Sequence, residues 1–271
     1  MLPYFRPPSF DLGPVTLEPF GLLTAIGVVV GSLLMARAAR LQGKDPQPLQ
    51  DLAIWALLGG LIGGHLVHLF LYHPEELSKS PWQIFKVWDG LSSFGGLLGG
   101  IIASLIFFWR RGIAGVREYG DALALGIAPG WGIARVGCFM VHDHPGMPTS
   151  FPLAIDFPAN VLAGGPRHDL GLYDALVLFS LAAVLWILFK RGALKGALLP
   201  LLAIGYGIPR FFFDFLRAYD LSYVDARYLG LTPGQYGCIL IVTWGVVMLV
   251  RRGTRPESKA AGASPHRGAE A

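Results

Sequence analysis

The sequence is poor in charged residues. Asp, Glu, Lys and Arg make up 15% of its 271 residues, whereas soluble globular domains carry about 25%. The basic residues behind the net charge of +4 gather at the ends of apolar segments, and no basic patch with interleaved aromatic residues accompanies them. The composition therefore argues against a soluble domain and against a nucleic-acid-binding protein.

Cysteine is scarce as well. The two cysteines, Cys138 and Cys238, both fall within apolar segments, which excludes a disulfide framework. The first 16 residues hold one basic residue, Arg6, among prolines and aromatic residues, and make a poor signal-peptide n-region. We expect this stretch to be a periplasmic or interfacial lead-in.

Long apolar runs are abundant, and hydrophobic residues make up 53% of the chain. Several runs approach the roughly 20 residues that a helix needs to cross a bilayer core. We predict an all-α polytopic membrane protein with about seven transmembrane helices, near residues 18–36, 51–72, 91–109, 119–141, 172–189, 196–216 and 235–250. Residues 1–252 would form one transmembrane domain, and residues 253–271, rich in small residues and mixed charge, a disordered cytoplasmic tail.

The basic residues between these runs indicate the orientation. Fourteen of the 22 lie in the first, third and fifth connections and in the tail, and six lie on the other side. The positive-inside rule therefore places the N-terminus outside and the C-terminus in the cytoplasm. Two basic residues remain, Arg135 and Arg210, and both lie inside apolar runs.

An arginine at bilayer depth costs a few kcal/mol, so it usually faces a cavity or a partner. Glycine and proline precede both arginines, which favours broken helices whose freed amides point at an anion. A guanidinium also binds phosphate bidentately. The two arginines thus predict a site for a lipid phosphate. The alternative is that each pairs with a buried acid, such as Asp214 one turn after Arg210.

Glycine pairs at helical spacing predict close helix contacts, since small residues let helices approach in lipid. These pairs involve residues 27 and 31, residues 59, 60, 63 and 64, and residues 95, 96, 99 and 100. The Pro- and Gly-rich stretch 142–171 is the longest connection, and such connections tend to be functional or mobile.

Several short motifs occur in a fixed order along the chain. They are Gly95-Gly96-Leu97-Leu98-Gly99, Arg135-Val136-Gly137 with Phe139, Pro166-Arg167-His168 with Leu172-Tyr173, and Gly205-Tyr206-Gly207 with Arg210 and Arg217. On about seven expected helices, this series resembles the prolipoprotein diacylglyceryl transferase family from Asp11 to Gln235, as a divergent member.

The resemblance implies transfer of diacylglycerol from phosphatidylglycerol to the lipobox cysteine of a secreted lipoprotein precursor, with glycerol phosphate leaving. It places the chain in the bacterial plasma (inner) membrane as a multi-pass protein, with no cofactor, metal or nucleic acid. The expected catalytic residues are Arg135, Arg210, Asp143, His142 and His144. The expected substrate-binding residues are Arg135, Arg210, Tyr206, Asp214, Arg217, Gly95, Gly96, Gly137 and His65.

The sequence departs from the family at several polar positions. The family's His-Gly-Gly motif reads Phe94-Gly95-Gly96, which removes the candidate general base. Cys138 stands where an asparagine is expected, His65 where an arginine is, and Phe20 where a tyrosine is. Expected glutamates are replaced by Asp143, Asp174 and Asp214. Lipid-phosphate binding survives these changes, but thiol activation needs another group.

His142 and His144 are candidates for that group, because imidazole suits proton transfer near neutral pH. They could instead be exposed loop histidines. Together with Asp143 and His168 they also offer four donors for a metal ion, without a diagnostic spacing. Two other functions stay open: a paralogue that binds phospholipid or lipoprotein without catalysis, and a lipid-headgroup enzyme with another acceptor.

Overall fold

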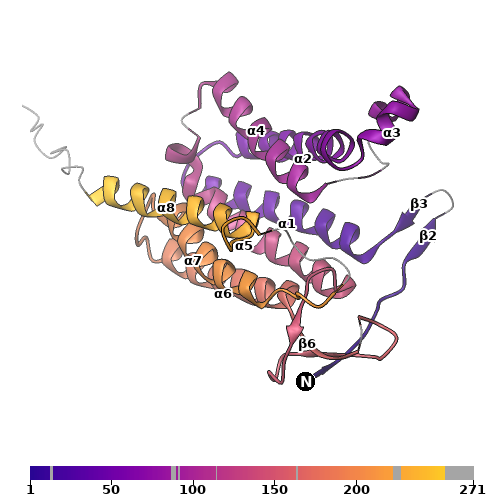
Figure 1. The fold of residues 1–271 in the computed structure, drawn as a ribbon. Coiled ribbons are helices and arrows are strands. Elements are labelled where there is room, and N and C mark those ends of the chain that lie inside the picture. Colours follow the sequence, from indigo (N-terminus) through magenta and orange to yellow (C-terminus); the bar gives the residue numbers. More distant parts are fainter. Residues whose placement is uncertain are drawn as a thin grey trace, which may run out of the picture.

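The computed structural model describes residues 1–12, 15–86, 90, 92–113, 115–162, 164–221 and 227–253. Long helices dominate it (Figure 1). They are α1 (Pro19–Leu41), α2 (Gln47–Val67), α4 (Ser93–Arg111), α5 (Val116–Val141), α6 (Leu170–Lys190), α7 (Leu198–Phe213) and α8 (Pro233–Gly253). Shorter helical turns are η1 (His68–Tyr72), α3 (Pro74–Lys79), η2 (Pro81–Phe85) and η3 (Asp214–Leu216).

Six helices in the described part of the chain are long and apolar enough to cross a membrane: α1, α2, α5, α6, α7 and α8. This confirms the prediction of an all-α polytopic membrane protein. The remaining expected run, 91–109, forms α4, which packs along α2. The orientation of the termini stays a prediction. The expected tail lies outside the described residues from residue 254 onward.

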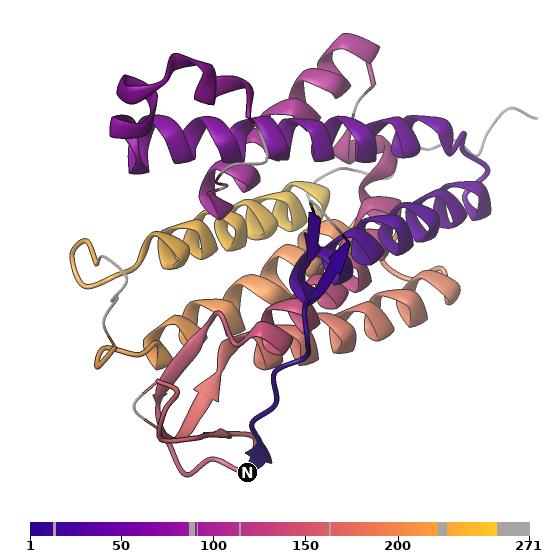
Figure 2. The ribbon, with the colours of Figure 1, turned by 90° about the vertical axis from the view of Figure 1, so that its right-hand side faces the viewer.

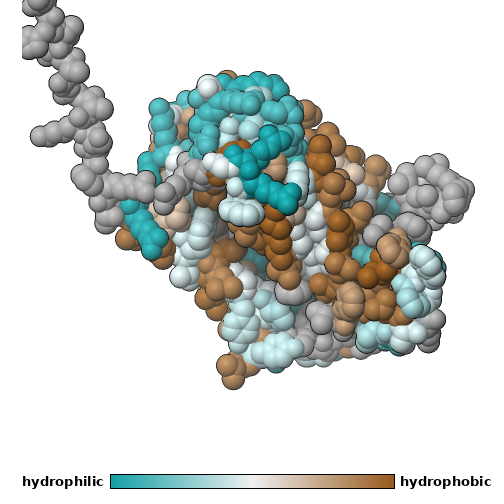
Figure 3. Space-filling model, turned by 90° about the horizontal axis from the view of Figure 1, so that it is seen from above, coloured by the Kyte–Doolittle hydropathy of each residue, from teal (hydrophilic) through white to brown (hydrophobic). Residues whose placement is uncertain are grey.

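The outer surfaces of the helices carry large hydrophobic side chains. Leu33, Leu105 and Leu240 are 60%, 64% and 71% exposed. Seen from above, hydrophobic residues cover broad areas of the helices beside a hydrophilic area (Figure 3). Apolar surface on this scale is rare on soluble monomers and suits a protein surrounded by lipid.

Glycines form the contacts between two pairs of helices, as the sequence predicts. Along α1 and α5, a Cβ on Gly31 would lie 3.0 Å from the carbonyl oxygen of Gly126. Along α2 and α4, a Cβ on Gly63 would lie 2.6 Å from the carbonyl oxygen of Gly95. The helix backbones therefore touch where both partners lack a side chain.

Alanine at Gly95 is expected to destabilise the protein, and alanine at Gly96 is expected to be tolerated. A Cβ at Gly95 would collide with the carbonyl oxygen of Gly63 and with Val67, whereas at Gly96 the nearest atom would be 3.5 Å away. Overpacking costs about 1–3 kcal/mol. The thermal unfolding midpoint of G95A in detergent should therefore fall below that of G96A, and equal midpoints would contradict this packing.

Helices α5 and α7 run through Pro129 and Pro209 without a break. The prediction of broken helices at these prolines is therefore wrong. Membrane helices tolerate proline where neighbouring helices pack closely. A Cβ on Gly130 would lie 2.6 Å from the carbonyl oxygen of Gly27, and one on Gly207 would lie 2.6 Å from Val242. The nearby glycines serve helix packing.

A small sheet, four-stranded by its hydrogen bonds, lies at one end of the helices (Figures 1 and 2). Its strand order is β1 (Leu2–Pro3), β5 (Ile155–Phe157), β6 (Gly165–Asp169) and β4 (Pro145–Pro148). In a separate two-stranded sheet, β2 (Phe10–Leu12) pairs antiparallel with β3 (Val15–Leu17). The sequence predicts no strand in these stretches, which are only two to five residues long; β1, β4 and β6 contain proline, whereas β2, β3 and β5 do not. Both edge strands contain proline, which a sheet accepts mainly at its edges.

The sheet brings three helix ends together. Strand β4 follows α5 directly, and β6 runs straight into α6. Helix α7 ends at the same place, because Arg217, just beyond it, forms an antiparallel bridge with Gly146 of β4. The C-terminal ends of α5 and α7 and the N-terminal end of α6 therefore meet beside the sheet.

Candidate active site

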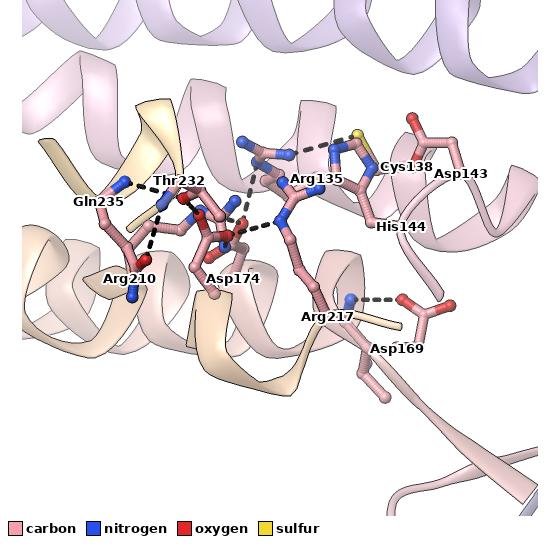
Figure 4. A network of polar contacts seen from close by, with 12 residues as sticks. Arg135, Cys138, Asp143, His144, Asp169, Asp174, Arg210, Arg217, Thr232 and Gln235 are labelled. Atoms are coloured by element: carbon pink, nitrogen blue, oxygen red, sulfur yellow. Dashed lines mark hydrogen bonds and ion pairs between the residues drawn. The ribbon is translucent and has the colours of Figure 1, made fainter. Parts of the chain in front are cut away.

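The two arginines inside apolar runs converge on one carboxylate. Arg135 comes from α5, Asp174 from the first turns of α6, and Arg210 from the last turn of α7 (Figure 4). Nε of Arg135 lies 3.3 Å from Oδ2 of Asp174, and Nε of Arg210 lies 3.5 Å from the same oxygen. Asp174 is thus the acid that joins the two cations.

A second carboxylate extends this contact. Oδ1 of Asp214 lies 2.9 Å from Nη1 of Arg210 and 2.7 Å from Nε of Arg217. Its other oxygen accepts a short hydrogen bond from the Thr232 hydroxyl. The pairing of Arg210 with the acid one turn later is therefore present, as the alternative reading of the sequence expects. We call Arg135, Asp174, Arg210, Asp214 and Arg217 the arginine cluster.

The arginine cluster carries one net positive charge, because it combines three guanidinium groups with two carboxylates. The side chains of Asp174 and Asp214 are each 1% exposed, and those of Arg210, Arg135 and Arg217 are 9%, 15% and 20% exposed, so the cluster is largely buried. At its edges, Asp143 and Arg227 add one charge of each sign. A buried excess charge is costly unless a counter-charge accompanies it. The cluster therefore favours a ligand with a single negative charge.

The cluster also retains hydrogen-bonding capacity. Among the described residues, Nε of Arg135 and Oδ1 of Asp174 are buried without an aligned hydrogen-bond partner. Nη1 of Arg210 is close to Asp214 but is likewise not aligned for a hydrogen bond. Guanidinium N–H groups bind the oxygens of a phosphodiester well.

Two aromatic side chains, Tyr206 and Trp131, lie beside the guanidinium group of Arg135. Tyr206 of α7, a residue predicted for the site, lies close enough to Arg135 to interact with its guanidinium group. The guanidinium lies 5.9 Å from the ring centroid of Trp131, and this ring lies 5.4 Å from that of Tyr206. A cation above an aromatic face is stabilised by the ring's quadrupole. The sequence reading missed Trp131, although it lies one helical turn before Arg135.

The cysteine that departs from the family pattern lies next to this cluster. Nη1 of Arg135 lies 3.7 Å from Sγ of Cys138. The potential metal-ligand atoms of Cys138, Asp143 and His144 all lie within 4.8 Å of one another. Asp143 also forms a short hydrogen bond with Nδ1 of His144. A thiophilic cation could contact these three donors, but the guanidinium beside the sulfur disfavours a second positive charge there.

The other two donors considered for a metal lie in different surroundings. His168 forms a 2.7 Å hydrogen bond with the hydroxyl of Tyr173, and burial lowers the pKa of His168. His142 contacts Asp169. Within the described residues, the four donors of the sequence-based metal hypothesis therefore do not meet at one point.

His142 and His144 point into different environments. His142 is 6% exposed, and its ring nitrogens lie 2.7 Å from Oδ2 of Asp169 and 3.0 Å from the carbonyl oxygen of Phe5. Rings of Tyr4, Phe5, Phe139 and Phe157 surround it. Its φ of +50° ends α5 and turns the chain. His142 therefore fastens the N-terminal segment to the sheet, while His144 stays beside the arginine cluster.

Four residues expected to bind substrate lie in helix contacts or in the wall of a cleft. His65 is buried in α2, with its ring nitrogens 3.2 Å and 3.0 Å from the carbonyl oxygens of Gly90 and Gln83. Gly95 packs against α2, and a Cβ on Gly137 would lie 3.2 Å from Phe20 of α1. Gly96 lines the cleft.

That cleft lies between the α1–α5 pair and the α2–α4 pair. Its volume is about 680 Å³, and its lining is almost entirely apolar. Trp131 and Ala134 form part of its wall. Since Trp131 also contacts Arg135, the cleft adjoins the arginine cluster. An apolar cleft beside a buried cation suits a molecule with hydrocarbon chains and an anionic head.

These features define a multi-pass membrane protein with a cationic site buried between its helices. Residues 7–251 match the prolipoprotein diacylglyceryl transferase family. The chain therefore belongs to this family of transferases.

Similar proteins are named phosphatidylglycerol–prolipoprotein diacylglyceryl transferase. The one from Azotobacter vinelandii is 35% identical, over 92% of this chain and 96% of its own length. The one from Oleidesulfovibrio alaskensis is 34% identical, over 91% and 93%. The one from Roseobacter denitrificans is 32% identical, over 90% and 92%.

Proposed function

We propose that this chain transfers the diacylglyceryl group of phosphatidylglycerol to the cysteine thiol of a secreted lipoprotein precursor, in the bacterial plasma (inner) membrane. One observation carries the proposal: Arg135 and Arg210 converge on Asp174 in a buried cluster with one net positive charge. A phosphodiester carries one negative charge, and the adjoining cleft can take its acyl chains. Family membership and the names of the relatives support the same reaction.

The site faces the side from which a secreted precursor arrives, given the orientation predicted from the basic residues. That prediction places the N-terminus outside. Strand β1 belongs to the sheet next to which the arginine cluster lies. The cluster then lies toward the outer face, and the basic connections lie at the opposite, cytoplasmic face.

Arg135 and Arg210 stabilise the departing phosphate. The sulfur of the acceptor cysteine forms a bond with the glyceryl carbon, and the bond between that carbon and the phosphate oxygen breaks. Glycerol phosphate leaves, and negative charge grows on its phosphate as the bond breaks. Fixed guanidinium groups act most strongly on charge that develops in the transition state. Tyr206, Asp174 and Asp214 hold the two guanidinium groups in place.

His144 accepts the proton of the acceptor thiol. It lies beside Cys138 and Asp143, next to Arg135, whereas both ring nitrogens of His142 are engaged elsewhere. Asp143 pairs with Nδ1 of His144, which fixes the ring and leaves Nε2 for proton transfer. This pair replaces the histidine that the family has at the position of Phe94.

The direct test is transfer of labelled diacylglycerol from phosphatidylglycerol to a lipobox peptide by the purified full-length protein. We expect a thioether-linked product and release of glycerol phosphate. A peptide with serine in place of the lipobox cysteine serves as the control. If phosphatidylglycerol binds but neither product forms, the transferase proposal is refuted.

A second function is favoured by Phe94, Cys138 and Phe20, which stand where the family has polar residues. The chain would then bind phospholipid or a lipoprotein without transfer, or use another acceptor. The Phe94→His variant separates these possibilities in a cell depleted of its own transferase. If growth returns only with Phe94→His, the native chain does not perform the reaction proposed here.

A further inference from the structure

An ion pair outside the arginine cluster joins β6 to the segment that follows α7. Arg167 of β6 has a side chain that is 3% exposed. Its Nη1 donates to Oδ1 of Asp220 at 2.9 Å, and its Nη2 donates a short hydrogen bond to Oδ2. These bonds lower the pKa of Asp220. The contact is bidentate, which fixes direction as well as distance.

The same arginine also holds the neighbouring strand. Nη1 of Arg167 donates to the carbonyl oxygen of Gly146 in β4 at 3.2 Å. Gly146 in turn forms the antiparallel bridge with Arg217. A Cβ on Gly146 would lie 2.6 Å from the carbonyl oxygen of Leu216 and 2.7 Å from His168. The segment after α7 therefore packs against β4 at Arg217 and is bound to β6 through the ion pair of Asp220.

This attachment bears on the charge of Arg210. Arg217 and Arg210 both contact Oδ1 of Asp214. Because Arg217 also interacts with this carboxylate, Asp214 neutralises the charge of Arg210 only in part. If Arg217 moved away, Oδ1 of Asp214 would neutralise Arg210 more fully, and Arg210 would attract an anion less strongly.

We propose that Arg167 and Asp220 are positioning residues: their ion pair holds Arg217 on Asp214, and Arg217 in that place keeps Arg210 available for the phosphate of the phospholipid. The inference rests on the function proposed above for the arginine cluster. It concerns binding of the lipid phosphate, and neither residue of the pair touches the reacting atoms.

The test compares Asp220→Asn with a matched control, Asp51→Asn. Asp51 forms a 2.7 Å ion pair with Arg111, and neither of these residues belongs to the arginine cluster. Equilibrium binding of short-chain phosphatidylglycerol to the purified full-length protein is measured. Substitutions within a coupled network change binding by roughly two- to thirtyfold. We expect a loss of that size for Asp220→Asn, and none for Asp51→Asn.

A double-mutant cycle with Arg217→Gln distinguishes an effect of Asp220 that acts through Arg217 from a general loss of structure in the variant. If Asp220 acts through Arg217, Asp220→Asn should weaken binding no further once Arg217 is replaced. Hydrogen exchange over residues 214–221 should rise in Asp220→Asn and stay at the wild-type level in Asp51→Asn. Arg167→Lys keeps the charge but loses the bidentate contact, so its affinity should fall between those of wild type and Asp220→Asn.

Unchanged affinity in Asp220→Asn, or losses that add in the double variant, would overturn the inference. The outcome is separate from that of the transferase proposal, since binding is measured without the acceptor peptide. A wild-type protein that binds phosphatidylglycerol but transfers nothing refutes the reaction, and the cycle still decides the role of the ion pair.

Discussion

Replacing Arg135 by alanine is expected to lower kcat/KM of diacylglyceryl transfer by roughly 10²- to 10³-fold, the loss typical when one preorganised donor to a developing anion is removed. Arg135 contacts Asp174, Tyr206 and the face of Trp131. Its guanidinium is therefore fixed before the substrate binds, and its loss removes the net positive charge of the cluster. Initial rates at several concentrations of phosphatidylglycerol give the measurement.

Two variants sharpen this prediction. Arg135→Lys keeps the charge but cannot form the bidentate contact, so its kcat/KM should lie between those of wild type and Arg135→Ala. Arg111→Ala removes an arginine whose side chain is 54% exposed and pairs with Asp51, and should leave turnover unchanged. Undiminished turnover in Arg135→Ala would remove this residue from the mechanism.

Replacing His144 by alanine is expected to lower kcat by roughly 10²- to 10⁴-fold, the usual contribution of a general base. His144 lies with Asp143 and Cys138 beside Arg135, where a thiol approaching the bound lipid would release its proton. The loss should shrink as the pH of the assay rises, because the acceptor thiol then ionises without help. The measurement is kcat against pH for both proteins.

His142→Ala is the matched comparison, two residues away. It leaves the buried Asp169 and the carbonyl of Phe5 without their imidazole partner, which costs about 1–3 kcal/mol of stability. We expect a lower unfolding midpoint and near-normal kcat in the protein that stays folded. The opposite pattern, with His142→Ala inactive and His144→Ala fully active, would reverse the assignment of the base.

The sequence was sufficient for the features that depend on composition and local spacing. The apolar runs predicted the helices, and the two basic residues inside these runs, Arg135 and Arg210, predicted two of the cations of the arginine cluster, whereas the buried Arg167 lies in an expected connection. The pairing of Arg210 with Asp214 follows from their spacing on one helix. The glycine pairs predicted which helix faces meet, although the partners of Gly27 and Gly31 on α5 became known only from the fold.

Features that depend on tertiary placement could not be predicted. Asp174 joins Arg135 to Arg210 only because three helix ends meet beside the sheet, and no local pattern marks that meeting. His142 and His144 have the same side chain and neighbouring positions. What separates them is the left-handed turn at His142, at a φ that residues other than glycine adopt rarely. Residues 145–148 likewise gave no prediction of a strand, because two of these four residues are prolines and one is a glycine.

The central claim is that the arginine cluster binds a lipid phosphate, and one comparison tests it most directly. Equilibrium binding of short-chain phosphatidylglycerol and of diacylglycerol with the same acyl chains is measured for wild type and Arg210→Gln, which cancels the net charge of the cluster. We predict that wild type binds phosphatidylglycerol at least roughly tenfold more tightly, the effect of one charge-assisted hydrogen bond, and that Arg210→Gln loses this preference. Equal affinity of the wild-type protein for the two lipids would contradict the account.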